Sequence, residues 1–149
     1  MRAIATASYA KGNVDIFWPD KNLTLWHAAS SGSAWSADFN VGFGQTFVSV
    51  PAATGCMAPP PQSQNPRARR HRAPAPRVDV FALGPDFSMR QQTTWNGALE
   101  TGGWNDLGGI VTSAPAAIAW NRDRIDVFGV GLDAAMYQRT VAGSSISQN

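Results

Sequence analysis

Apolar and polar positions alternate over residues 125–130, a pattern that favours a half-buried β-strand. Asp126 and Phe128 share one face of this strand, and Ile125 and Val127 share the other. Turn-forming residues flank it at 121–123 and 131–133, an apolar β-tolerant segment precedes it, and residues 135–141 read as a further strand. The pattern predicts a meander of short antiparallel strands.

The same pattern occurs two more times along the chain. In every copy an Asp follows a β-branched residue and a Phe comes two positions later. The copies begin at Val14, Val78 and Ile125, so the steps between them are 64 and 47 residues. The difference of 17 residues predicts an insertion between the first two copies.

Repeats of about 40 to 50 residues with several strands each are typical of β-propeller blades. A fourth strand of the unit is predicted where Trp104 leads into residues 105–109. We therefore predict one all-β domain over residues 1–149, a partial propeller of about three four-stranded antiparallel blades at about 3–49, 50–112 and 113–149. The last blade is expected to be incomplete and to stop before its fourth strand. Because closed propellers have four to eight blades, we expect a homo-oligomer or a part of a longer propeller.

The insertion is expected at about residues 57–76, where proline and arginine dominate and little apolar surface can be buried. Such a segment is expected to be disordered or polyproline-like. Its arginines have two interpretations. They could form an electrostatic patch that binds nucleic acid or an anionic membrane, or the segment could be a tolerated insertion without a binding role. Because no aromatic residues are interleaved with them, we favour the tolerated insertion, and nucleic acid is not an expected partner. The arginines in question are Arg67, Arg69, Arg70, Arg72 and Arg77.

Composition narrows the class of protein further. The chain has 149 residues, a net charge of +2 and one cysteine, Cys56, so an internal disulfide is impossible. No apolar run is long enough for a membrane span, and the N-terminus lacks the apolar core of a signal peptide. We expect a cytoplasmic or non-classically released protein. His27 has no second histidine near it in sequence, so we predict no metal site and no cofactor.

The repeated acids have two interpretations. Asp79 with Asp86, or Asp126 with Asp133, resemble the carboxylate pairs of glycoside hydrolases. A catalytic pair is needed only once, however, whereas the first Asp recurs in every unit and the second recurs as Asp86 and Asp133, with Asn22 at its place in the first unit. Recurrence favours a role in turns and strand-end hydrogen bonds, and we expect no enzyme activity.

Aromatic residues that recur with the unit are the candidate ligand-binding groups. Trp26 and Tyr137 are expected on the third strand of their units, and Trp35 and Trp104 on the fourth. The flat face of a Trp and the donor at its rim suit a sugar ring. Packing between blades is the alternative for each of these residues.

Three motifs of the chain match one blade repeat: PAAIAW at 115–120, RIDVFGVGLDAAMY at 124–137 and WNDLGG at 104–109. With these motifs the chain resembles the PLL-type seven-bladed β-propeller lectins. This resemblance implies a carbohydrate-binding protein, often specific for fucose or methylated sugars, with shallow sites between consecutive blades and avidity from several sites. Members of that family are metal-independent and commonly oligomeric.

The resemblance also ranks the sites. The space between the second and third units has the most candidate aromatic residues. Trp104, Trp120 and Tyr137 are the expected sugar-binding residues there, and Trp35 and Trp26 are further candidates. The family aromatic is replaced by Arg90 in the second unit, and the motif that begins at Trp35 is degraded. We therefore predict a non-catalytic lectin; an interaction or scaffold propeller is the alternative, and a glycosidase the third.

Overall fold

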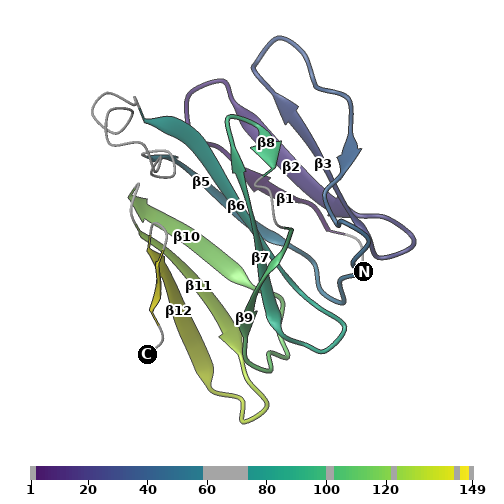
Figure 1. The fold of residues 1–149 in the computed structure, drawn as a ribbon, viewed down its shortest axis with the longest axis vertical. Coiled ribbons are helices and arrows are strands. Elements are labelled where there is room, and N and C mark those ends of the chain that lie inside the picture. Colours follow the sequence, from purple (N-terminus) through teal and green to yellow (C-terminus); the bar gives the residue numbers. More distant parts are fainter. Residues whose placement is uncertain (1–2, 59–73, 100–102, 122–123, 143–144, 148–149) are drawn as a thin grey trace.

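The structure is a computed structural model that describes residues 3–58, 74–99, 103–121, 124–142 and 145–147. Its regular elements are β-strands, arranged in three antiparallel sheets that lie one after another along the chain (Figure 1). The predicted all-β class with four-stranded blades is confirmed. Within the described residues, no helix is long and apolar enough to cross a membrane.

The first sheet has the strand order β1-β2-β3-β4. Its central strands pair from Val14–Ser30 to Pro19–Leu25, so the alternation read from the sequence is the pleat of this hairpin. Asp15, Phe17 and Pro19 are buried on one face, whereas Val14 is exposed on the other. The strands are β1 (Ala5–Ala7), β2 (Val14–Pro19), β3 (Leu25–Ser30) and β4 (Phe39–Asn40).

The second sheet has five strands because two short strands share one edge. Both β8 and β9 pair with β7, β8 at its Trp95 end and β9 at its Met89 end. Together they take the place of the single fourth strand that the sequence predicts. The strands are β5 (Ala52–Ala58), β6 (Ala75–Leu83), β7 (Met89–Trp95), β8 (Ala98–Leu99) and β9 (Asn105–Gly108).

The third sheet corrects one prediction, because it has a short fourth strand. This strand, β13, pairs with β12 at residues 140–142, in the same way as β8 pairs with β7. The described residues of this sheet include no counterpart of β9. The strands are β10 (Ala116–Asn121), β11 (Arg124–Val130), β12 (Met136–Ala142) and β13 (Ser145–Ser147).

The hairpin turn between the second and third strands is the same in all three sheets. Leu23, Phe87 and Ala134 lie in the left-handed region there, with φ of 62°, 62° and 60°. Each donates its N–H to the carbonyl three residues earlier, at 3.2, 2.9 and 3.1 Å. These residues are spaced by the steps of 64 and 47 that the sequence repeat predicts, so the repeat holds at the level of backbone geometry.

The sheets pack face to face like blades, with β5 between β1 and β10 along their inner strands (Figure 1). We call the contact between the first and second sheets the first junction, and that between the second and third the second junction. Each junction is one cluster of buried apolar side chains. The first contains Phe17, Leu25, Val41, Phe47, Val78, Val80, Ala82 and Trp104, and the second Phe81, Leu83, Met89, Leu107, Val111, Ile125, Val127 and Val141.

The expected insertion begins later and ends earlier than the composition suggests. The β5–β6 ladder continues to the pair Ala58–Ala75, so four residues assigned to the insertion, 57, 58, 75 and 76, are strand residues. Arg77, counted with the solvated arginines, is 3% exposed and bonded to Asp79 through Nε at 2.6 Å and Nη2 at 2.9 Å. Residues 59–73 lie outside the described part of the chain.

Candidate functional site

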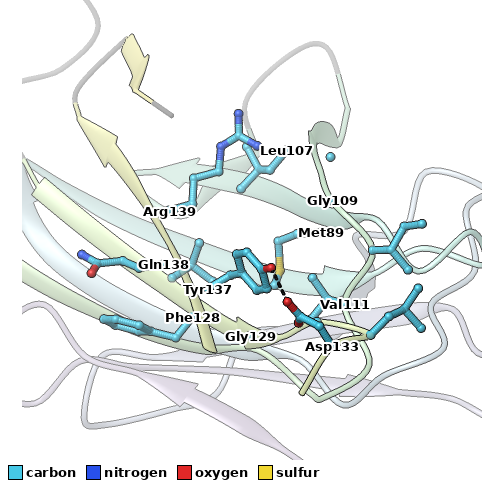
Figure 2. Close-up of a pocket in the computed structure, with 15 residues that line it drawn as sticks. Met89, Leu107, Gly109, Val111, Phe128, Gly129, Asp133, Tyr137, Gln138 and Arg139 are labelled. Carbon is cyan, nitrogen blue, oxygen red and sulfur yellow. Dashed lines mark hydrogen bonds between the residues drawn. The ribbon is translucent and has the colours of Figure 1, made fainter. Parts of the chain in front are cut away.

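A cavity of about 510 Å³ opens at the second junction (Figure 2). Its size lies within the range of small-molecule sites in proteins. One wall comes from β7, β9 and the segment after β9; the other comes from β11, β12 and the turn between them. The lining residues are Met89, Leu107, Gly108, Gly109, Ile110, Val111, Val127, Phe128, Gly129, Gly131, Leu132, Asp133, Tyr137, Gln138 and Arg139.

The equivalent space at the first junction is filled by Trp104. Its indole is 7% exposed, donates to the carbonyl of Val41 at 2.8 Å, and packs against Phe47 with ring centroids 4.4 Å apart. By the repeat spacing and strand pairing, Val41 and Phe47 correspond to Leu107 and Val111, which line the cavity. The same kind of wall that encloses an indole at the first junction is thus present at the second junction, where the described residues leave the cavity of about 510 Å³.

Gly129 shows how tightly the floor of the cavity is built. A Cβ atom at this position would lie 2.5 Å from Cγ1 of Val111, closer than real Cβ atoms approach a neighbour. The corresponding residue of the second sheet is Ala82, which is fully buried. A small residue is thus required where the segment after β9 crosses β11.

Tyr137 is held in the cavity wall by Asp133. Its hydroxyl donates to Oδ2 of Asp133 at 2.7 Å, and the pair is drawn in Figure 2. This hydrogen bond lowers the pKa of Asp133, which also accepts the N–H of Ala135, and raises the pKa of Tyr137. Asp133 is therefore a carboxylate at neutral pH, with Oδ1 and Oδ2 already engaged in orienting the turn and the phenol.

A hydrogen bond from this strand position to an acid of the hairpin turn also occurs in the other two sheets. Asp20 accepts a hydrogen bond from Nε1 of Trp26 at 3.3 Å, and Asp86 accepts one from Nη2 of Arg90 at 2.9 Å. Trp26, Arg90 and Tyr137 are thus equivalent positions, each tied to the acid of its own hairpin. In the first sheet the acid is Asp20, not Asn22 as the alignment of the repeats indicates.

Arg139 lines the cavity and has a side-chain donor without a hydrogen-bond partner. Its Nε atom is buried and has no hydrogen-bond partner within the described residues. Buried donors in folded proteins are nearly always bonded, so this donor without a partner would bond a ligand oxygen once the side chain turns toward the cavity. Figure 2 shows the side chain of Arg139 near Leu107, on the side of the cavity away from Asp133.

The structure brings only one of the five predicted binding residues into the cavity. Tyr137 lines it, and Trp104 fills the first junction instead. Trp120 is 63% exposed on the outer side of the third sheet, where its Nε1 donates to Asp126. Trp26 lies on the outer side of the first sheet, and Trp35 is 57% exposed beyond β3.

Trp35 and Trp104 are not equivalent residues, although both were expected on fourth strands. Trp35 forms a bridge with Ser30, which corresponds to the pairing of Leu99 with Thr94 in the second sheet. Trp104 instead lies directly before β9, and β9 is the strand that corresponds to β4. The differing spacing after each Trp obscured this in the sequence.

The first Asp of each unit accepts side-chain hydrogen bonds from residues of its own and neighbouring strands. Asp79 is fully buried and accepts bonds from Arg77, Gln91 and Thr93, the last two at 2.6 and 2.8 Å. Asp126 accepts corresponding bonds from Arg124 and Thr140, and Asp15 bonds Nε2 of His27 at 2.6 Å.

These acids therefore lie mid-strand, and the predicted turn role belongs to Asp20, Asp86 and Asp133 alone. No group of three or more His, Cys, Asp or Glu side chains in the described residues is placed to hold a metal ion.

Sequence reasoning missed Arg139, Met89 and the glycines of the cavity. Arg139 corresponds to Gln92 and Ala28, so nothing repeats at this position that could have drawn attention to it. The two consecutive glycines at 108 and 109 are a signal that could have drawn attention to this segment, because both adopt positive φ, 73° and 78°.

No protein-family model matches the chain, and no curated protein matches it by sequence. Solved structures do resemble it. The fucose-specific lectin from Aleuria aurantia superposes with a TM-score of 0.67 at 12% identity, covering 98% of this chain and 43% of the lectin. AofleA from Arthrobotrys oligospora gives a TM-score of 0.69 at 11% identity, covering 98% and 41%.

A third structure is of similar length to this chain. The fucose lectin from Kordia zhangzhouensis, solved with methyl-fucoside, gives a TM-score of 0.62 at 15% identity and is covered over 99% of both chains. The chain thus spans about two fifths of the Aleuria and Arthrobotrys proteins and nearly all of the Kordia protein. At these identities the likeness establishes the fold.

Proposed function

We propose that the protein is a non-catalytic lectin that binds fucose or a related sugar in the cavity at the second junction. The observation that carries this proposal is an apolar cavity whose described lining includes Arg139, a residue with a buried Nε donor that has no hydrogen-bond partner. Two solved structures that share the fold support the choice of sugar, because the Aleuria protein is a fucose-specific lectin and the Kordia protein is a fucose lectin solved with methyl-fucoside.

The chemistry of the wall suits a deoxy sugar. Such a ring has an apolar edge with a methyl group, and hydroxyls elsewhere. Met89, Val111 and the ring of Tyr137 offer an apolar surface, while Arg139 can donate to a hydroxyl oxygen. Because an indole fills the equivalent space at the first junction, the cavity has room for a six-membered ring.

The same wall offers little support for a reaction. Glycoside hydrolysis uses two carboxyl groups across the scissile bond. Asp133 is the one carboxylate among the lining residues of the cavity, and it is committed to Tyr137 and Ala135. We therefore propose recognition without turnover, with glycans as the partners.

Single sites of this kind bind weakly, and multivalency raises their avidity. We propose that several sites act together, either in a homo-oligomer or in a longer propeller that contains this unit.

Arg139→Leu tests the site. Loss of a charge-assisted hydrogen bond should weaken the binding of methyl-fucoside about tenfold or more, measured by isothermal titration calorimetry. Lys21→Leu, which removes one exposed cation from the turn of the first sheet, is the matched control and should bind as the wild type does.

A glycan array on the wild-type protein decides the function itself. Binding to fucosylated glycans supports the proposal. No binding to any glycan would contradict it and leave the scaffold alternative. Release of aglycone from chromogenic fucosides would contradict the non-catalytic part.

A further inference from the structure

Large apolar side chains are exposed along one edge of the molecule, which we call the rim. The rim consists of the hairpin turns at residues 20–24, 84–88 and 131–135 and of the two segments that connect the sheets, residues 41–51 and 109–115 (Figure 1). Single apolar residues are common on protein surfaces, but a row of them marks a contact surface. The residues in this row, which are between 44% and 75% exposed, are Leu23, Phe43, Val48, Phe87, Ile110 and Leu132.

Backbone hydrogen bonds join the turns and the connecting segments into one continuous edge. Each connecting segment donates one N–H to the turn of its own sheet and the next N–H to the strand that precedes the turn of the following sheet. The exposed apolar residues therefore follow one another along all three sheets. The four bonds are between 2.7 and 3.0 Å long and run from Phe47 to Leu23, Val48 to Leu83, Val111 to Phe87 and Thr112 to Val130.

The backbone of the rim shows that folding alone does not favour these residues. Leu23, Phe43 and Phe87 have φ of 62°, 51° and 62°, in the left-handed region that glycine and asparagine adopt at a lower cost than bulky side chains. About half of each side chain is exposed, so packing offsets this cost only in part. Residues in unfavourable backbone conformations cluster at functional sites, which supports a contact with something outside the chain.

The charges of the rim favour a zwitterionic lipid surface over an anionic one. The connecting segments have no charged residue, and the turns have Asp20, Asp86, Asp133 and Lys21, a net charge of −2. Anionic lipids repel carboxylates, whereas the choline cations of a phosphatidylcholine surface attract them. Each of the three carboxylates also accepts a backbone N–H of its own turn, so it stays hydrogen-bonded in the less polar headgroup region.

The shape of the rim favours a fluid partner. The apolar side chains stand on separate turns and segments, so a folded protein would need a matching pocket for each of them. Lipids, in contrast, rearrange around each side chain separately. We propose that the rim inserts its apolar side chains into the interface of a zwitterionic membrane and docks the protein there peripherally. Burial of apolar surface in the interface drives such binding.

Docking by the rim would also place the cavity at the membrane, a consequence that rests on the proposed function. Ile110 and Leu132 belong both to the rim and to the lining of the cavity. A sugar bound in the cavity of the docked protein would then be that of a lipid-linked glycan.

Flotation with sugar-free phosphatidylcholine vesicles tests the docking independently of lectin activity. The wild type should float with the vesicles in a density gradient. A variant that combines Leu23→Asn, Phe43→Asn and Phe87→Asn loses three apolar side chains and should partition into the vesicles about 100-fold more weakly. Because asparagine suits the left-handed backbone, this variant should unfold in urea at no lower concentration than the wild type.

Trp35→Asn is the matched control, because it removes a larger apolar side chain that is 57% exposed at the opposite edge, where Ser30 pairs with Val14. It should float as the wild type does. A wild type that stays out of the vesicle fraction, or a triple variant that floats equally well, would overturn the proposal. Binding that requires phosphatidylserine and survives the triple substitution would also overturn it, because that contact would belong to the arginines at 67–72.

Vesicles that carry a fucosylated glycolipid separate the docking from the sugar site. Binding should exceed that to plain phosphatidylcholine, and free methyl-fucoside should remove the excess but leave the binding to plain vesicles. An excess that methyl-fucoside does not remove would contradict the placement of the cavity at the membrane. Flotation on plain vesicles without any binding of methyl-fucoside in solution would contradict the proposed lectin function and leave the docking in place.

Discussion

Asp126 shows how a single side chain connects three elements of the third sheet. It lies in β11 and accepts hydrogen bonds from Trp120 of β10, Thr140 of β12 and Arg124 of its own strand. The pKa of Asp126 falls to about 2, chiefly through the bond from Arg124, against the opposing effect of burial. The carboxylate form is therefore part of the folded structure.

Acid should remove this contribution. Because the folded pKa of Asp126 is below the unfolded value of 3.8, its ionised form stabilises the fold fully above about pH 4, and the effect is lost as the pH falls through about 2. Asp126→Asn should be less stable than the wild type at about pH 6 and close to it at about pH 2, as measured by urea unfolding.

The control for this experiment is Asp38→Asn, because Asp38 is exposed. It should remain within about 0.5 kcal/mol of the wild type. A gap between wild type and Asp126→Asn that is the same at both pH values would show that the ionised form of Asp126 does not matter.

At the scale of elements, the repeated pattern of a β-branched residue, Asp and Phe made β2, β6 and β11 predictable. Buried residues alternate with more exposed ones along β2, whereas β6 is buried on both faces because a sheet packs on each side of it. Short edge strands such as β8 and β13 have two or three residues and leave no such pattern.

Site residues were harder to predict than strands for a physical reason. A repeated Trp satisfies both sugar stacking and core packing, and sequence cannot separate these roles. Tyr137 proved to line the cavity, whereas Trp104 packs in the first junction. Arg139 was not predicted because the lack of a hydrogen-bond partner for its Nε is a property of its surroundings, which only the structure shows.

Trp104 should behave as a core residue. Trp104→Ala removes a buried indole and leaves the carbonyl of Val41 without its donor, so it should lower the free energy of unfolding by about 3 to 5 kcal/mol. Trp35→Ala makes the same substitution at an exposed position and should cost about 0.5 kcal/mol or less. Urea denaturation compares the two, and equal losses would contradict the assignment of Trp104 to the core.

At the scale of the whole molecule, the fold rests on repeated geometry with little repeated sequence. The structures it resembles share 11 to 15% of their residues with it, and yet TM-scores reach 0.69. What the three sheets share is the left-handed residue of one hairpin turn, an acid that holds the turn, and aromatic or aliphatic residues at equivalent positions, which are buried where a neighbouring sheet covers them. Those features suffice to stack one sheet on the next.

The segment between β5 and β6 should be dispensable for this stack. Replacing residues 59–74 with Asn-Gly joins the pair Ala58–Ala75 by a two-residue hairpin turn. The shorter connection should raise the free energy of unfolding by about 1 to 2 kcal/mol by reducing the entropy of loop closure.

Removal of Arg67, Arg69, Arg70 and Arg72 also changes the net charge from +2 to −2. Chemical denaturation measures the stability of the shortened chain, and methyl-fucoside titration shows whether the cavity is intact. Loss of cooperative unfolding would show that the replaced segment contributes to the core.

The pairing of Ala58 with Ala75 holds two points of the chain side by side, joined by a ladder that runs unbroken back to the pair Ala52–Phe81. A site for the insertion of a second domain requires two neighbouring chain positions of this kind. A domain whose own N- and C-termini lie close together can be inserted there without distorting the β5–β6 hairpin. The hairpin lies away from the cavity residues, which come from positions 89 to 139. A fluorescent domain placed between Ala58 and Ala75 would therefore give a fluorescent fusion protein in which the cavity keeps its lining residues.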